Sequence, residues 1–246
     1  MMKRFIPFAA MSAVAMLTSG CNVLSREAEA RDAGPVVDRS YSVGAFDRIA
    51  VAGPYEVTVT TGGQPRVIAH GGEAILAETE IVVENGELQI RPRNNDGIRW
   101  TWSRGGKVRV EVSAAALRSA DIAGSGGLRI DRIAGGDFEG NVAGSGDLAI
   151  ARIDAGKVEF GVAGSGNVQA AGKAQSLDVS IAGSGDVDVS ALDVVAADVS
   201  IAGSGNVRAR ATGTAAVSIL GSGDVEIMGG ARCNVSKGGS GDVRCG

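Results

Sequence analysis

One set of acidic and amide side chains recurs in this sequence directly after a Gly-Ser-Gly triplet. The residues in that position are Gly127, Asp147, Asn167, Asp186, Asn206, Asp224 and Asp242. Carboxylate and amide oxygens bind calcium, as in nonapeptide-repeat solenoids, which carry a binding turn on both sides of each coil. The return stretches here, such as ALDVVAAD, carry no such turn. We therefore predict no metal site and interpret the series as a hydrogen-bonded polar ladder. A calcium ion, if bound, would sit at Asp224 and Asp242, which have no Asn between them.

The Gly-Ser-Gly triplet is a second candidate for chemistry, because glycine-rich loops cradle phosphate groups. Such a loop needs a helix after the turn and usually ends in Gly-Lys-Ser/Thr. The nearest approach, GNVQAAGKA from Gly166, has Asn167 in place of the first glycine and Ala174 in place of Ser or Thr. We therefore interpret the triplet as a structural turn. Glycine adopts the positive φ of a sharp turn, and the alanine before it is small enough to sit inside the corner.

Catalytic chemistry finds little support in the residue pattern. The one histidine, His70, has no cysteine or carboxylate spacing near it that indicates a metal site or a triad, and we expect it on the surface or in a turn. Carbohydrate-active parallel β-helix enzymes place Asp, Arg or Lys on long loops beside the coil, whereas the repeat interval here never exceeds twenty residues. The sequence predicts neither enzymatic activity nor a cofactor.

Two cysteines near the end of the sequence indicate a disulfide. Cys233 and Cys245 lie seven residues before and five residues after Ser240, so a turn at Ser240 brings them face to face. In an oxidising compartment such a bond stabilises the fold by about 3 kcal/mol. The alternative is a pair of buried free thiols.

Two tryptophans, Trp100 and Trp102, lie in the stretch NNDGIRWTWSRGG and form the strongest candidate for a binding spot. Their spacing places both rings on one side of an extended segment, and tryptophan platforms stack on sugars or partner surfaces. The alternative is that both rings cover the open end of a β-sheet as part of the core.

The Gly-Ser-Gly triplets recur at intervals of 18 to 20 residues, and this period defines the architecture. The triplets begin at Gly124, Gly144, Gly164, Gly183, Gly203, Gly221 and Gly239. Apolar residues alternate with polar ones on both sides of each triplet, which indicates strands with one buried face. The sequence therefore predicts an all-β fold over 119–246, a parallel β-helix-like solenoid of about seven coils. Lys237 stands in an inward column of the last coil, which suits a terminal cap.

Residues 44–118 predict an irregular β-rich section whose later strands lead into the solenoid. Alternating stretches at 46–53, 55–61, 79–92 and 107–113 indicate strands, and Asn85-Gly86 indicates a two-residue hairpin. GEAILAE predicts a short helical turn. Residues 44–246 are expected to form one continuous domain.

The first 43 residues are interpreted as a targeting segment and a tether. Lys3 and Arg4 precede an apolar run that ends in LTSGC, which resembles a bacterial lipobox with Thr18 where Leu is usual. We predict a signal peptide over 1–20, lipidation of Cys21 and a tether over 21–43. The rival is cleavage after Ala-Glu-Ala at 28–30. Asn22 is not Asp, so the resemblance to Gram-negative lipoproteins implies the outer membrane, with a periplasmic or surface-facing domain.

The series FDRIAVAGPYEVTV, ENGELQI, VRVEV and the repeated AGSG[DN]V is similar to the head-GIN or DUF2807 domain family of auto-transporter adhesins over about 44–246. The resemblance implies a parallel β-helix-like fold and an exported, often lipid-anchored protein. It supplies no catalytic residues.

Charge excludes one class of partner. The formal net charge is −4, and loss of Lys3 and Arg4 makes it −6; no basic patch with interleaved aromatics is present, so nucleic-acid binding is not expected. We therefore predict a non-enzymatic cell-envelope lipoprotein. Its partners are the membrane, through the lipid anchor, and an unknown envelope protein or glycan. The alternatives are a carbohydrate-active enzyme and a calcium-responsive adhesion module.

Overall fold

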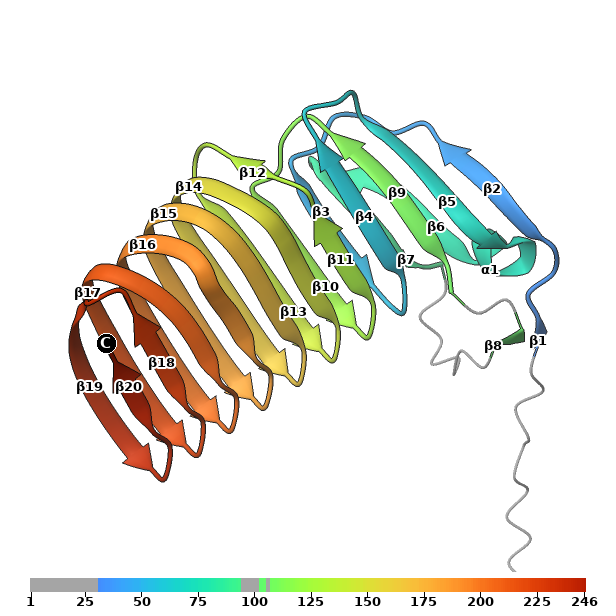
Figure 1. Cartoon of the computed structure of the whole chain (residues 1–246). Coiled ribbons are helices and arrows are strands. Elements are labelled where there is room, and N and C mark those ends of the chain that lie inside the picture. Colours follow the sequence, from blue (N-terminus) through green and yellow to red (C-terminus); the bar gives the residue numbers. More distant parts are fainter. Residues whose placement is uncertain (1–30, 94–101, 105–106) are drawn as a thin grey trace, which may run out of the picture.

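The computed structural model describes residues 31–93, 102–104 and 107–246, and Figure 1 shows them as an elongated stack of strands. Residues 119–246 wind into a β-solenoid of about six turns, so the predicted fold class is confirmed. The solenoid strands are β10 Ser119–Gly124, β11 Gly127–Ile130, β12 Ile133–Ala134, β13 Phe138–Gly144, β14 Asp147–Gly164, β15 Asn167–Gly183, β16 Val187–Gly203, β17 Val207–Gly221, β18 Val225–Met228, β19 Arg232–Gly239 and β20 Val243–Cys245.

Each layer of the solenoid contributes one strand segment to each of two parallel sheets, joined at the Gly-Ser-Gly corner. Face A contains the segments before the corner: β10, β13, the later parts of β14–β17, and β19. Face B contains the segments after it: β11, the first parts of β14–β17, β18 and β20. The segments returning from face B to face A, predicted as looser connections, continue largely as strand in β14–β17.

Columns of aliphatic side chains fill the space between the two faces. The residues two positions before the corners stack in register and are exposed by 3% or less; they are Ile122, Val142, Val162, Ile181, Ile201 and Ile219. Burying one such side chain contributes about 2 kcal/mol. Because each layer lies about 4.8 Å from the next, no layer buries its apolar face alone.

The two glycines of each corner are required for different reasons. Gly203 has a φ of +142°, and a Cβ there would also lie 2.0 Å from the carbonyl oxygen of Gly183 in the preceding layer. Gly205 lies outside the left-handed region, but a Cβ there would lie 2.2 Å from the carbonyl oxygen of Gly185. The sequence prediction of positive φ therefore explains only the first glycine of each triplet.

The alanine before each corner was expected inside it, and that expectation is wrong. Ala143, Ala163 and Ala202 are exposed on face A. The strand alternation continues up to the first glycine, so the buried residue before each alanine forces the alanine outward.

The N-terminal section extends the same two faces rather than forming a separate irregular unit. Its elements are β1 Arg31–Asp32, β2 Val36–Tyr41, β3 Arg48–Ala52, β4 Glu56–Thr61, β5 Arg66–Gly72, α1 Glu73–Ala77, β6 Thr79–Glu84, β7 Glu87–Pro92, β8 Trp102–Arg104 and β9 Arg109–Ala114. Strand β3 pairs with β10, and β4 pairs with β11, both in parallel, so the layering already begins at Arg48. No break in pairing separates residues before and after 118.

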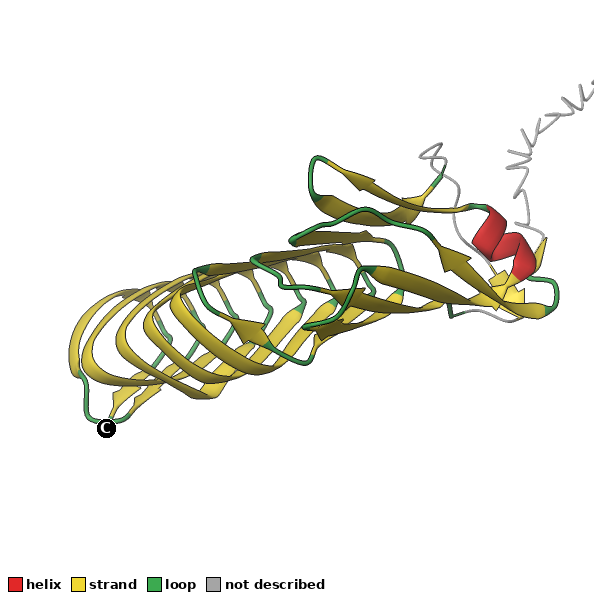
Figure 2. Ribbon diagram, turned by 90° about the horizontal axis from the view of Figure 1, so that it is seen from above, coloured by secondary structure: helices red, strands yellow, loops and turns green. Residues whose placement is uncertain are grey.

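Beyond this layer, parallel pairing gives way to antiparallel pairing toward the N-terminal end. Strands β7 and β9 are still parallel to β3 and β4, whereas β6, β5 and β2 are antiparallel to their neighbours. The β6–β7 hairpin turns at Asn85 and Gly86, both with positive φ, as predicted. The predicted helical turn is α1, which buries Ile75 and Leu76 at the end opposite the C-terminus (Figure 2). Strand β2 lies within residues predicted to be tether.

Candidate binding groove on face B

The Asp and Asn side chains that follow the corners form the predicted polar ladder along face B. Asn167 Nδ2 donates a hydrogen bond to Asp147 Oδ1 at 2.8 Å, and Asn206 Nδ2 donates to Asp186 Oδ1 at 2.9 Å. At the C-terminal end, the backbone N–H of Asp242 donates to Asp224 Oδ1 at 2.9 Å. Amide and backbone donors thus separate or satisfy carboxylates that would otherwise repel one another at strand spacing.

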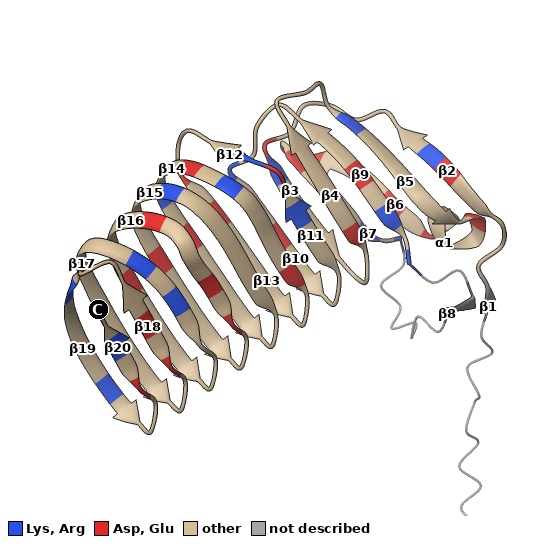
Figure 3. Ribbon diagram, viewed as in Figure 1, with Lys and Arg blue, Asp and Glu red and all other residues tan. Residues whose placement is uncertain are grey.

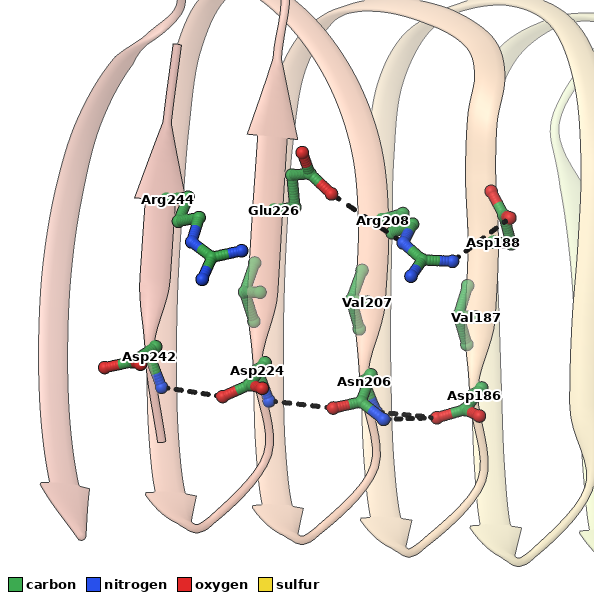
Figure 4. Close-up of a pocket in the computed structure, with 11 residues that line it drawn as sticks. Asp186, Val187, Asp188, Asn206, Val207, Arg208, Asp224, Glu226, Asp242 and Arg244 are labelled. Carbon is green, nitrogen blue, oxygen red and sulfur yellow. Dashed lines mark hydrogen bonds and ion pairs between the residues drawn. The ribbon is translucent and has the colours of Figure 1, made fainter. Parts of the chain in front are cut away.

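A second ladder of alternating charge runs beside the first, two residues further along each strand. Arg208 pairs with Asp188 at 4.0 Å in the layer before it and with Glu226 at 3.7 Å in the layer after it (Figure 4). Arg244 stands next in the column, and its side chain makes no ion pair or hydrogen bond with any residue that the structure describes. The sequence analysis missed this ladder, although the 18-to-20-residue period aligns its members.

The two ladders line a shallow groove of about 290 Å³ at the C-terminal end of face B. Buried valines, among them Val187 and Val207, stand between the ladders, so the groove presents polar groups held by a rigid aliphatic layer. Five carboxylates and two guanidinium groups line it: Asp186, Asp188, Asp224, Glu226 and Asp242, with Arg208 and Arg244. Figure 3 shows charges of both signs interspersed along the stack.

Hydrogen bonds hold Asp188 in its ionised form. The Ser190 hydroxyl donates to Asp188 Oδ1 at 2.6 Å, and the Ser190 backbone N–H donates to the same atom at 3.1 Å. The hydroxyl bond is the main cause that lowers the pKa of Asp188, against an opposing effect of burial; the backbone bond and the charge of Arg208 lower the pKa further.

This lowered pKa predicts a specific pH dependence. A carboxyl whose pKa is lower in the folded state stabilises the fold above its unfolded pKa of about 3.9, and that contribution disappears as the pH falls through the folded value. We therefore expect Asp188→Asn to lower the urea midpoint at pH 7 and to match the wild type near the acid end of the titration. Asp198→Asn, at an exposed position on face A, is the control. Parallel curves for wild type and Asp188→Asn would contradict the assignment.

Three of the predicted site residues stay predictions. Cys21 and Trp100 lie outside the described residues. Trp102 belongs to β8, which pairs in parallel with β1, and only its backbone is described. The proposed tryptophan platform and the lipidation site are therefore untested by the structure.

Cys233 and Cys245 are joined in the structure, with their sulfur atoms 2.12 Å apart. Cys233 lies on β19 and Cys245 on β20, so the bond links the two faces across the interior of the last layer. This is the pairing that the sequence analysis predicts.

His70 lies on strand β5 and has carboxylate neighbours that its sequence context does not reveal. Its Nδ1 is 2.6 Å from Asp38 Oδ1 on β2, and its Nε2 is 3.7 Å from Glu111 Oε1 on β9. Antiparallel pairing of β5 with β2 and β9 brings these groups together. Even so, within 31–93, 102–104 and 107–246 the structure contains no group of three or more His, Cys, Asp or Glu residues arranged to hold a metal ion. Asp224 and Asp242 belong to no such group.

A parallel solenoid with polar faces and short corners places the chain among the solenoid repeat proteins. The family model described as "putative auto-transporter adhesin, head GIN domain" (DUF2807) matches residues 45–231, and the chain belongs to this family. Among curated proteins, none matches the chain.

Solved structures share this fold at low sequence identity. A "putative adhesin" from Bacteroides fragilis superposes with a TM-score of 0.79 at 19% identity, covering 86% of this chain and 97% of that one. A "putative lipid binding protein" from Parabacteroides distasonis gives a TM-score of 0.70 at 21% identity, covering 87% and 97%. A "putative adhesin" from the same species gives 0.68 at 20% identity, covering 87% and 98%. These similarities establish the fold.

Among the helices of the described part of the chain, none is long and apolar enough to span a membrane.

Proposed function

We propose that this chain is a non-enzymatic cell-envelope protein, anchored through lipidated Cys21, that binds a glycan through the groove on face B. The main support for this proposal is the groove, in which a rigid aliphatic layer holds two ladders of polar side chains. Among the described residues, the Arg244 side chain in this groove has no partner. Membership of a family described as adhesins supports a binding role over a catalytic one.

The chemistry of the groove favours a partner rich in hydroxyl groups. A sugar hydroxyl both donates and accepts hydrogen bonds, so it is able to bind the carboxylates and the guanidinium groups that alternate here. A partner of one charge sign would meet repulsion from part of the lining, because acidic and basic groups lie within one or two layers of each other.

Adhesion of coated beads tests this proposal. The chain from Asn22 onward is coupled to beads, and bead retention is measured on surfaces carrying neutral, anionic or cationic polysaccharides. We expect retention on at least one polysaccharide and a loss of about tenfold in affinity for Arg244→Ala, about 1.4 kcal/mol, since arginine is among the residues whose truncation costs most at binding surfaces.

Arg132→Ala is the matched control, because Arg132 is an exposed arginine on the return side, away from the groove. An equal loss in Arg132→Ala, or no retention of the wild type on any polysaccharide, would overturn the proposal. Release of shortened oligosaccharides would instead support the carbohydrate-active enzyme. A calcium-dependent rise in Tm would support the calcium-responsive module, because an ion that binds only the folded state stabilises it.

A further inference from the structure

The C-terminal end of the solenoid presents two strand edges that have no neighbour among the residues that the structure describes. Strand β19 pairs with β17, and β20 pairs with β18, each on one side only. Unpaired N–H and C=O groups along an edge are a template for a strand from another molecule. A solenoid is especially exposed to this hazard, since the end layer of a second copy has nearly the same shape as the layer it would cover.

Lys237 breaks the aliphatic column at this end. It pairs in register with Ile219, and the column holds Ile or Val in every earlier solenoid layer. Its Nζ donates a hydrogen bond to the carbonyl oxygen of Gly241 at 2.9 Å. In the first layers the equivalent carbonyls of Gly126 and Gly146 accept backbone N–H groups of the following layer. In the layers next to this end, the corresponding N–H groups donate instead to Asp or Asn Oδ1 atoms of the preceding layer. Lys237 therefore pairs the Gly241 carbonyl from within its own layer.

The disulfide alters two more inward positions of the same layer. Cys233 pairs in register with Ala215, and Cys245 with Ile227. Their bond spans the interior where the next layer would pack. Val235 remains the one large aliphatic side chain of β19, 42% exposed. At three inward positions, the described part of the last layer therefore carries residues that differ from those of the preceding layer. This layer also lies beyond residues 45–231, which the family model matches.

We propose that this last layer is a stop that prevents a second copy of the chain from stacking on the C-terminal edge. An incoming layer would bury the Lys237 ammonium between two aliphatic layers, and burying a charge without a charged partner is costly. The disulfide holds β19 and β20 in a closed arrangement that does not need another layer. The occupant excluded is a second copy, because its own last layer has the same unpaired edges, spacing and inward columns as the edge it would cover.

Restoring the repeat at this end tests the proposal. The triple variant Cys233→Ala, Lys237→Ile, Cys245→Ile gives the last layer the same residues as the layer before it at these three positions. We expect the wild type to remain monomeric and the variant to reach at least dimer mass as concentration rises, measured by light scattering and sedimentation. In the associated variant, hydrogen exchange at the β19 amides should slow, because the edge becomes paired.

Lys173→Ile is the matched control, since it exposes an isoleucine at a lysine position on the return side, far from either end. Association of this control to the same extent would overturn the proposal, as would a folded triple variant that stays monomeric or a wild type that stacks end to end. If circular dichroism shows that the triple variant is unfolded, Lys237→Ile alone, with the disulfide intact, decides by the same measurements. A monomeric, folded Lys237→Ile then overturns the proposal.

Discussion

Replacing Gly203 with alanine is expected to destabilise the fold by about 4 kcal/mol. Two costs combine at this position. The φ of +142° is a conformation that residues with a side chain rarely adopt, and the new Cβ would lie 2.0 Å from the carbonyl oxygen of Gly183. That oxygen also accepts the Ser204 N–H at 2.8 Å, so it is unable to move away without loss of a backbone hydrogen bond between layers. Urea unfolding followed by circular dichroism measures the effect.

Two further variants separate the causes. Gly205→Ala tests close approach alone, because its Cβ would lie 2.2 Å from the Gly185 carbonyl oxygen although its φ is unremarkable. Gly238→Ala is the control: its Cβ would be 3.4 Å from the nearest atom, on Leu220, and the repeat has alanine in this column in most layers. We expect a change within about 0.5 kcal/mol for Gly238→Ala. A comparable loss in all three variants would mean that the corners do not depend on the stacked glycine backbone.

The solenoid was predictable because a short motif fixes both the corner and the phase of the strands around it. Once Ile201 is placed inside, strand alternation places the next residue, Ala202, outside. The prediction for the alanine was wrong because it did not continue this alternation up to the first glycine of the corner. The second glycine is different. A glycine is required there because a Cβ would meet the carbonyl group of the preceding layer. The sequence of a single repeat does not show that contact.

The edges of the N-terminal section were harder to predict, because their pairing joins segments far apart in the sequence. Strand β2 has an alternation of exposed and half-buried residues without a buried face, so it carries no clear strand pattern. Its pairing with β5 brings Asp38 to His70. Neither segment alone indicates that contact, so the sequence analysis left His70 without a partner.

The groove lies between these two cases. Its first ladder follows the corner motif and was identified from the sequence. Its second ladder, Asp188, Arg208, Glu226 and Arg244, becomes visible when the layers are aligned and the charges in one outward column are compared. What the alignment does not supply is which arginine is left without a partner, because side-chain geometry decides that Arg208 pairs with both neighbours.

Phe160→Ala is expected to cost about 4 kcal/mol, because it removes one of the largest buried side chains and leaves a cavity between the faces. Phe160 lies edge-on to Phe138, with ring centroids 6.3 Å apart. It also stacks in register on Gly140 of the preceding layer, where a Cβ would lie 2.8 Å from Leu148 Cδ2 and 3.0 Å from the Phe160 ring. The aromatic ring therefore occupies space that the glycine leaves free.

This compensation between layers makes the two positions energetically coupled. Gly140→Ala alone should destabilise by crowding the ring, and Phe160→Leu alone by leaving space, each by about 1–3 kcal/mol. The double variant keeps a similar total volume, so we expect its loss to be smaller than the sum of the two single losses by at least about 0.5 kcal/mol, in a double-mutant cycle of urea unfolding free energies. Additive losses would show that each layer packs its own core independently, which contradicts a column in which the large side chain of one layer fills the space left by the layer before it.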